Sequence, residues 1–246
     1  MKIIIHPEYQ LAQHLIAQLP NMFATKGTII YAGRNVVKSF DTQFGEWVVK
    51  RYKSPNIVQK IAYSFFRKSK AERAFIYADK LLALGINTPN AIAYIEEKKY
   101  KLFNYSYFVS NVCKDAPLYP TLVETTNYNK ELVGKLAAFF VDMHKKGFLH
   151  GDPNLDNILY RAIGENDFFF TVIDTNRSVF KTEISYEACL DNLKRITHRR
   201  GLLKEIVEEY AKLRNWDIQL SIKRVMIALD KFERRRQLKR IIKWKA

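Results

Sequence analysis

Cysteines and long apolar runs are both scarce in this sequence. Its 246 residues include only two cysteines, Cys113 and Cys189, which lie far apart and form no CxxC pair. This scarcity argues against a disulfide scaffold or a cysteine-ligated metal, and it favours a reducing compartment. No apolar run approaches the roughly 18 residues that span a bilayer, and the apolar start at residues 3–5 is too short for a signal peptide. We therefore expect a cytoplasmic protein.

Acidic residues are few relative to basic ones, so the formal net charge is +16. The last 26 residues hold ten Lys or Arg against two acidic residues, and residues 51–70 hold six Lys or Arg and no acidic residue. Such a basic field favours anionic partners, for example nucleic acid, anionic lipid or a phosphorylated glycan. For each single cluster, a solvated surface is the simpler interpretation.

The first half of the chain has the patterns of a β-rich lobe. Apolar runs and alternation predict three strands within residues 28–52. A helix is expected over about 69–84, followed by two strands around a turn at Glu96–Lys99. Three strands with short connections suggest an antiparallel meander. Residues 1–112 are therefore expected to form an antiparallel sheet with one main helix.

The second half changes to a mostly helical character. A strongly apolar helix is expected at 130–146, and two short strands end at Tyr160 and Asp174. From about residue 185 onward, the spacing of apolar residues is helical. The sequence thus predicts an α+β fold with two lobes, the second of which comprises residues 113–246.

The stretch FLHGDPNLDNILY, which begins at residue 148, concentrates polar side chains between apolar ones. Asp152 is followed five residues later by Asn157, and Asp174 comes seventeen residues after that, at the end of a predicted strand. Lys50 lies on the third predicted strand of the first lobe, and a helix follows it. The stretch alone is compatible with a solvated turn. In this order, however, the residues match the template of kinase-type phosphoryl transfer.

The residue types suit that chemistry. Mg²⁺ prefers hard oxygen ligands, which Asp174 and the amide of Asn157 can supply. Asp152 can receive the proton of an acceptor hydroxyl, and Lys50 supplies a cation for the phosphates of ATP. A turn at Gly33 allows main-chain N–H groups to approach those phosphates. Positioning and charge stabilisation then account for most of the catalysis.

HGD in place of HRD resembles the small-molecule and atypical branches of the kinase fold: aminoglycoside phosphotransferases, RIO-type kinases and lipopolysaccharide core kinases. Three further stretches most resemble the Kdo/WaaP lipopolysaccharide kinase family: IDTNR (173–177) in place of DFG, IIYAGRNVVK (29–38), and SKAERAFIYADKLLALGINTPNAIAYI (69–95). The resemblance covers roughly residues 25 to 200 and implies a bilobal protein-kinase-like fold. It also implies transfer of a phosphoryl group from ATP, with Mg²⁺, to Kdo or heptose in the lipopolysaccharide inner core. The acceptor would be an anionic glycolipid at the inner face of the inner membrane.

The resemblance assigns roles to individual residues. Asp152 would be the catalytic base, Asn157 and Asp174 the metal ligands, and Lys50 the ligand of the α/β-phosphates. Further contacts to the nucleotide would come from Gly33, from Val109 in a hinge at 108–112, and from Glu72 as the partner of Lys50. His150 would brace the catalytic loop.

Several positions depart from the protein-kinase pattern. The glycine-rich loop is reduced to Gly33, and no APE motif follows the IDTNR stretch. Asn154 stands where protein kinases place a lysine two residues after the catalytic aspartate, so that charge must come from elsewhere, for example from Arg177. These departures argue against a protein kinase that is regulated by phosphorylation.

Other functions are compatible with the same sequence. A RIO-like protein kinase and an aminoglycoside-type phosphotransferase share the HGD form, and a non-catalytic pseudokinase could use the basic regions to bind a membrane or nucleic acid. For the kinase, we expect a glycolipid or sugar acceptor and peripheral contact with an anionic membrane, whereas nucleic acid is not an expected partner. Ile241, Ile242 and Trp244 among the cations of the C-terminal tail suggest an interfacial helix, with a solvated helix as the simpler alternative.

Overall fold

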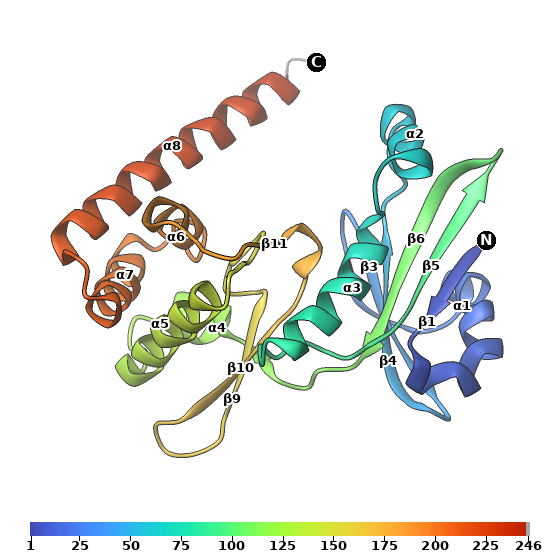
Figure 1. Cartoon of the computed structure of the whole chain (residues 1–246), viewed down its shortest axis with the longest axis horizontal. Helices are drawn as coiled ribbons and strands as arrows, with labels where there is room; N and C mark the ends of the chain where they lie inside the picture. Colours follow the sequence, from blue (N-terminus) through green and yellow to red (C-terminus); the bar gives the residue numbers. More distant parts are fainter. Residues whose placement is uncertain (245–246) are drawn as a thin grey trace. The chain divides into compact units, whose positions relative to one another are not determined.

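The computed structural model describes the backbone of residues 1–244 and the side chains of residues 1–239. The chain forms two compact units (Figure 1). The first unit comprises residues 1–114 together with 174–177, and the second comprises residues 115–173 and the chain from 178 onward. The division at 112–113 expected from the sequence placed residues 174–177 in the second lobe, but the short 3₁₀ helix η2 (Thr175–Arg177) belongs to the first unit.

The first unit is built on a six-stranded sheet in which all neighbouring strands are antiparallel. The strand order is β1-β5-β6-β4-β3-β2. The strands are β1 (Lys2–Ile5), β2 (Thr28–Ala32), β3 (Val36–Thr42), β4 (Gly45–Tyr52), β5 (Ala91–Lys99) and β6 (Leu102–Asn111). Strands β2 to β4 form the predicted meander, whereas β1 at the sheet edge was not predicted.

The turn between β5 and β6 lies further along the chain than predicted. Lys98 and Lys99 are still in the ladder, where they pair with Phe103 and Leu102. The turn is made by Tyr100 and Lys101, whose φ angles are 52° and 63°. Two residues with positive φ are typical of a tight hairpin connection. The prediction of a turn at Glu96–Lys99 was therefore wrong, because polar side chains on an exposed hairpin end resembled a turn.

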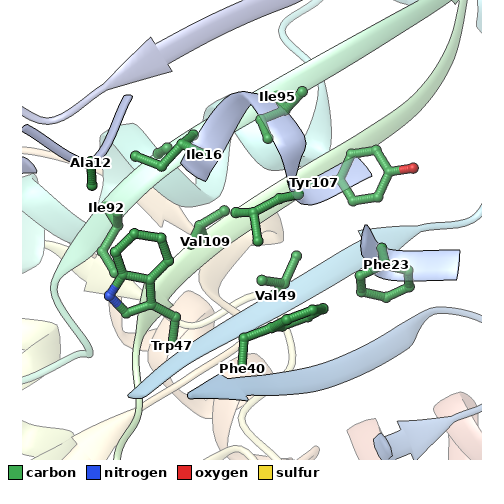
Figure 2. Packing of buried hydrophobic residues seen from close by; sticks show 12 residues of the cluster. Ala12, Ile16, Phe23, Phe40, Trp47, Val49, Ile92, Ile95, Tyr107 and Val109 are labelled. Atoms are coloured by element: carbon green, nitrogen blue, oxygen red, sulfur yellow. The ribbon is translucent and has the colours of Figure 1, made fainter. Parts of the chain in front are cut away.

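Helix α1 (Gln13–Thr25) covers one face of the sheet, after the short 3₁₀ helix η1 (Pro7–Ala12). Figure 2 shows Ile16 and Phe23 of α1 packing against side chains from the strands. Trp47 and Val49 of β4 are fully buried in this cluster. Burial of such side chains contributes roughly 1.5–3 kcal/mol each relative to exposure. Helix α1 was not predicted from the sequence, although its side chains form most of the helical side of this core.

Helix α3 (Lys70–Ala83) covers the opposite face of the sheet and matches the predicted main helix. The side chain of Ser69 accepts a hydrogen bond from the N–H of Glu72 and thereby caps the helix start. Gly85, with φ of 66°, follows the end of the helix. A smaller helix, α2 (Ile57–Phe65), lies against β6 (Figure 1).

The second unit is mostly helical. Its main core lies between α5 (Lys130–Lys145) and α7 (Arg200–Arg214), which bury apolar faces against each other. The remaining helices are α4 (Leu118–Val123), α6 (Tyr186–Leu193) and α8 (Ile218–Trp244). Two small antiparallel sheets join β7 (Ala116–Pro117), β9 (Ile158–Ala162) and β10 (Phe168–Val172), and β8 (Phe148–Leu149) with β11 (Val179–Phe180).

The C-terminal part of α8 can be described only by its backbone. The tail residues Ile241, Ile242 and Trp244, which suggested an interfacial helix, have side chains outside the described residues. Within residues 1–244, no helix combines the length and the apolar character that a bilayer crossing needs.

Candidate active site

Lys50 of β4 makes the central ion pair of the first unit. Its Nζ lies 2.7 Å from Oδ1 of Asp174, and the two side chains are 17% and 32% exposed. Alternation along β4 places Lys50 and Tyr52 on the face that α3 covers, whereas Val49 lies in the core on the other face. The lysine and the aspartate predicted as phosphate and metal ligands are therefore direct neighbours in this unit.

The backbone at Asp174 is in a rarely used conformation. Its φ is 56°, in the left-handed region that residues other than glycine seldom adopt. The side-chain amide of Asn176 donates a hydrogen bond to the same Oδ1 that Lys50 contacts. Among the described residues, the other carboxylate oxygen of Asp174 accepts no hydrogen bond. Strain of this kind is concentrated at functional sites, where the surrounding structure holds a residue in place.

Several further cations surround this ion pair, and we call the group the cation cluster (Arg34, Lys50, Lys70, Arg73 and Arg177). The amines of Lys50 and Lys70 lie 5.5 and 5.9 Å from the ring centroid of Tyr52. Burial lowers the pKa of Lys70, and the nearby guanidinium groups of Arg34, Arg177 and Arg73 lower it further. Asp174 is the acid that opposes this shift. The cluster thus carries more positive charge than its carboxylate neutralises.

The cluster also contains an unsatisfied donor. Nε of Arg73, on the first turn of α3, is buried and has no hydrogen-bond partner within the described residues. Burial raises the pKa of Tyr52, and the charge of Asp174 raises it further, so the phenol stays protonated as a neutral group beside the cations. A buried donor without a partner is costly. An anionic ligand with several oxygens, such as a polyphosphate, would satisfy it.

Glu72 does not contact Lys50, although the sequence predicted it as the partner of this lysine. Lys50 pairs with Asp174 and not with Glu72, whose charge instead influences Lys2 and Tyr94. Glu72 lies on the first turn of α3, where its main-chain N–H donates to Oγ of Ser69, and the carboxylate that contacts Lys50 is that of Asp174.

Gly33 and Val109 are both engaged within the sheet. The N–H of Gly33 donates to the carbonyl of Asn35 at 3.0 Å, and the hydroxyl of Tyr31 covers the glycine. Val109 is fully buried in the middle of β6 and is paired with Val49 of β4 and with a residue of β5. The residue next to Gly33, Arg34, is the one that acts on the cation cluster.

His150 of the HGD motif holds the loop of the second unit in place by two contacts with the main chain. Nδ1 of His150 accepts from the N–H of Asp152 at 3.0 Å, and Nε2 lies 2.9 Å from the carbonyl oxygen of Ile173. A carbonyl only accepts, so Nε2 carries the proton and the ring is the neutral tautomer. With both nitrogens engaged in main-chain bonds, the imidazole shapes the loop and is not available for proton transfer.

Asp152 is held by an arginine that follows α6. Arg195 donates through NH2 to Oδ1 of Asp152 at 2.9 Å and through NH1 to the carbonyl of Gly151 at 2.6 Å. The side chains of Asp152 and Arg195 are 32% and 29% exposed. The amide nitrogen of Asn157 donates to the main-chain carbonyl of Asp152 at 2.9 Å. This orientation leaves the amide oxygen of Asn157 without a hydrogen bond among the described residues.

A buried polar network supports the loop from behind. Asn192 of α6 donates to the carbonyl of His150 at 2.8 Å, and its side-chain oxygen lies 3.1 Å from Nε2 of His144. Nδ1 of His144 lies 2.9 Å from the hydroxyl of Tyr210 on α7. Burial lowers the pKa of His144 to about 4, and the bond to Asn192 opposes this shift. His144 is therefore neutral at physiological pH.

Acidification should weaken the fold through His144. Below a pH of about 6.5 the unfolded chain binds a proton at this histidine, whereas the folded chain does not until about pH 4. The stabilising contribution is complete above pH 6.5 and is lost as the pH falls to 4, by about 3 kcal/mol in total. Urea unfolding midpoints between pH 7 and 4 measure the effect. In the His144→Leu variant the urea midpoint should depend less on pH than in wild type. In the control His14→Leu, which replaces an exposed histidine, the midpoint should depend on pH as it does in wild type.

Several residues of these two groups were not predicted from the sequence, among them Arg34, which directly follows the predicted Gly33. Lys70 and Arg73 are three residues apart on the first turn of α3, so a search for cations on the helix face that follows Lys50 could have found them. Arg195 lies within the basic run KRITHRR, which is typical of a solvated surface, and Asn192 belongs to no motif. Neither of these two gives a signal in the sequence.

Comparison with known proteins identifies the family of this chain. The profile of the lipopolysaccharide kinase (Kdo/WaaP) family matches residues 25–213, whereas no curated protein sequence matches. A solved structure of WaaP in complex with acyl carrier protein is similar, with a TM-score of 0.59 and 15% identity, over 96% of this chain and 98% of that chain. At this identity the likeness shows the fold alone, and it confirms the predicted α+β protein-kinase-like class. Because the family profile covers most of the chain, the protein belongs to the lipopolysaccharide kinase (Kdo/WaaP) family and is a phosphotransferase with an alcohol group as acceptor.

Proposed function

We propose that the protein transfers the γ-phosphoryl group of ATP, with Mg²⁺, to a sugar hydroxyl of Kdo or heptose in the lipopolysaccharide inner core. The observation that carries this proposal is the Lys50–Asp174 pair, 2.7 Å apart, within a cluster of excess cations. Such an arrangement suits a polyphosphate and a metal ion better than a neutral ligand. Membership of the family supplies the substrate class.

The first unit would bind the nucleotide. Lys50 would contact the α/β-phosphates, and Arg73 would satisfy its buried Nε on a phosphate oxygen. The turn at Gly33 would contribute mainly through Arg34, since the N–H of Gly33 is bonded within the turn. Because Val109 lies between two strands, we place the adenine contact at the segment directly after β6 and not at Val109 itself. Glu72 is left with the role of a capping-turn residue.

The residues present fit a magnesium ion. Asp174 and Asn157 each keep one oxygen that accepts no hydrogen bond from the described residues, and these are the hard ligands that Mg²⁺ prefers. Within residues 1–239, no group of three or more His, Cys, Asp or Glu forms a dedicated metal cage. Magnesium in kinases usually needs only one or two protein oxygens, because phosphates and water complete its shell. When bound, it would neutralise charge on the phosphates.

The second unit would handle the acceptor. The sugar hydroxyl would donate its proton to Asp152 while its oxygen forms a bond to the γ-phosphorus, and the bond from that phosphorus to the β–γ bridging oxygen would break to release ADP. Arg195 fixes Oδ1 of Asp152, which leaves Oδ2 as the proton acceptor. The same arginine is a cation beside the catalytic aspartate, at a site where Asn154 supplies no charge.

The acceptor also suggests where the protein works. We infer that the protein acts in the cytoplasm, in peripheral contact with the inner face of the inner membrane, where a glycolipid acceptor is available. The basic surface suits an anionic membrane, whose surface attracts each nearby Lys or Arg by about 1 kcal/mol. Nucleic acid is not required as a partner for this function.

The proposal is tested by incubating the purified chain with γ-labelled ATP and lipopolysaccharide that carries an unphosphorylated inner core. The expected result is one labelled phosphate on a core sugar, located by mass spectrometry of the released oligosaccharide. Chelation with EDTA should stop the transfer, and added Mg²⁺ should restore it. Label on a protein would favour a RIO-like kinase, and label on an aminoglycoside would favour a small-molecule phosphotransferase. No binding of Mg·ATP in calorimetry would identify a pseudokinase.

A further inference from the structure

Helix α2 of the first unit exposes an unusual number of large apolar side chains. Ile57, Val58 and Ile61 are 60%, 71% and 44% exposed, and Phe65 and Phe66 are 69% and 81% exposed. The helix buries none of its residues completely. Single exposed apolar residues are common on protein surfaces, but five within ten consecutive residues form a patch that needs an explanation.

The opposite face of α2 explains why this patch points outward. The ring of Tyr63 lies 5.3 Å from that of Phe103 on β6, and Oγ of Ser64 accepts from the N–H of Phe103 at 2.9 Å. At 3.6 residues per turn, Tyr63 lies opposite the exposed stripe at residues 57, 58, 61 and 65, and Ser64 lies at the edge of that stripe. The helix is thus anchored to the sheet by its aromatic and polar side, while its aliphatic side faces solvent.

The tip of the β5–β6 hairpin extends the same surface. Tyr100 at the tip is 87% exposed. Lys98, Lys99 and Lys101 surround it, and Nζ of Lys99 lies 5.5 Å from its ring centroid. Figure 1 shows α2 and this tip at the same end of the first unit, which agrees with the bond between Ser64 and Phe103 near the tip.

Positive charge surrounds the apolar patch. Residues 51–70 contain six Lys or Arg and no acidic residue. Lys53, Arg67 and Lys68 in this stretch are exposed. Lys53 precedes α2, and Arg67 and Lys68 directly follow Phe66, so exposed cations flank the apolar side chains along the chain. An amphipathic helix with aromatic residues and flanking cations is the composition that binds the interface of an anionic bilayer.

We propose that this docking face, formed by α2, Phe66 and the β5–β6 tip, binds an anionic lipid bilayer. Phe65, Phe66 and the aliphatic side chains would enter the boundary between headgroups and acyl chains, and the lysines and arginines would contact lipid phosphates. Tyr100 would lie at the headgroup level, where an aromatic ring with a polar end is favoured. The binding of lipid does not depend on the proposed function. Only its purpose does, because docking would bring the kinase to a glycolipid acceptor.

The composition of the patch favours a bilayer over nucleic acid. A site for single-stranded nucleic acid combines a positively charged groove with aromatic rings on which bases stack. Here three of the five exposed apolar side chains on and after α2 are aliphatic, namely Ile57, Val58 and Ile61, and they offer no ring for stacking. A short DNA duplex should therefore bind weakly and compete poorly with vesicles.

Vesicle flotation tests the apolar part of the docking face. The full-length chain should float with vesicles that contain phosphatidylglycerol and remain largely unbound with pure phosphatidylcholine vesicles. The variant Phe65→Ser/Phe66→Ser should bind the anionic vesicles at least tenfold more weakly. Its control, Leu11→Ser/Ile163→Ser, removes side chains that are 91% and 56% exposed elsewhere and should bind like wild type. Equal binding by the two double variants would overturn the proposal.

A charge series tests the cations in the same assay. Lys98→Gln/Lys99→Gln/Lys101→Gln should weaken vesicle binding severalfold and reduce its dependence on salt. The control Lys26→Gln/Lys145→Gln/Lys204→Gln neutralises three lysines that are exposed elsewhere. If the control weakens binding as much as the hairpin variant, attraction is a property of the whole basic surface and the docking face is refuted. Preferential binding of the DNA duplex at this face would refute it as well.

The activity readout separates this inference from the proposed function. Wild type and Phe65→Ser/Phe66→Ser should phosphorylate a soluble, deacylated core oligosaccharide at equal rates, whereas on vesicle-embedded lipopolysaccharide the variant should be slower. Vesicle binding without any transfer to the core would contradict the proposed function and leave the docking face intact. If wild type and variant transfer phosphate at equal rates to both acceptors, the docking face is contradicted and the proposed function is not.

Discussion

Replacing Asp152 by asparagine should lower kcat for transfer to the core sugar by about 10²–10⁴-fold, the range that a general base contributes. The substitution preserves size and leaves an oxygen that can still accept from Arg195. It removes the charged oxygen that would take the hydroxyl proton. The KM for ATP should change little, because the cation cluster of the first unit is untouched.

Steady-state kinetics with the soluble core oligosaccharide measure the effect, and the same loop provides the control. Asp156 lies four residues from Asp152 and stands in a turn, where its N–H binds the side chain of Asn154 at 3.0 Å. Asp156→Asn removes an equivalent charge without touching Asp152 or Arg195, so its kcat should remain within about twofold of wild type. Equal losses in the two variants would mean that the charge of the loop matters, and not the proton acceptor.

The loop of the second unit shows what sequence order can predict. The HGD motif and its spacing to Asn157 have a local physical basis, because His150 and Asn157 each bind the main chain of Asp152. His150 binds the N–H of Asp152, and Asn157 binds the carbonyl of the same residue. Such short-range constraints are written into the spacing of the motif. The strands of the first meander and the capped helix α3 were predictable for the same reason.

Interactions between distant segments could not be predicted in this way. Arg195 contacts Asp152 at a sequence separation of 43, and nothing in its basic surroundings marks it. The pairing of Lys50 was assigned to Glu72 by analogy, whereas in the structure the carboxylate that contacts Lys50 is that of Asp174, which lies more than a hundred positions away in the sequence. Helix α2 had the right composition for a helix, but only its exposure reveals that its apolar face lacks a covering element within the described residues.

The second large effect is expected at the ion pair of the first unit. Lys50→Met should lower kcat/KM for ATP by about 10²–10³-fold, the usual cost of removing one preorganised group that stabilises charge in the transition state. Methionine replaces most of the unbranched stem of lysine, so the fold should be preserved, and it removes the amine that lies 5.5 Å from the ring centroid of Tyr52. Calorimetry with Mg·ATP and steady-state kinetics measure binding and turnover separately. Lys53→Met is the matched control, because Lys53 is exposed just beyond the end of β4 and should leave both values unchanged.

The partner substitution decides whether the pair acts as a unit. Asp174→Asn should cost at least as much as Lys50→Met, because it removes the carboxylate that would hold Mg²⁺ and also the acid that balances the cation cluster. In the proposed site Lys50 binds the phosphates and Asp174 binds Mg²⁺, although their side chains also lie 2.7 Å apart. Because these roles are separate, the losses of the two single variants should multiply in the double variant. A double variant that is no less active than the less active single variant would mean that the two residues act only as one unit, which would contradict the separate roles.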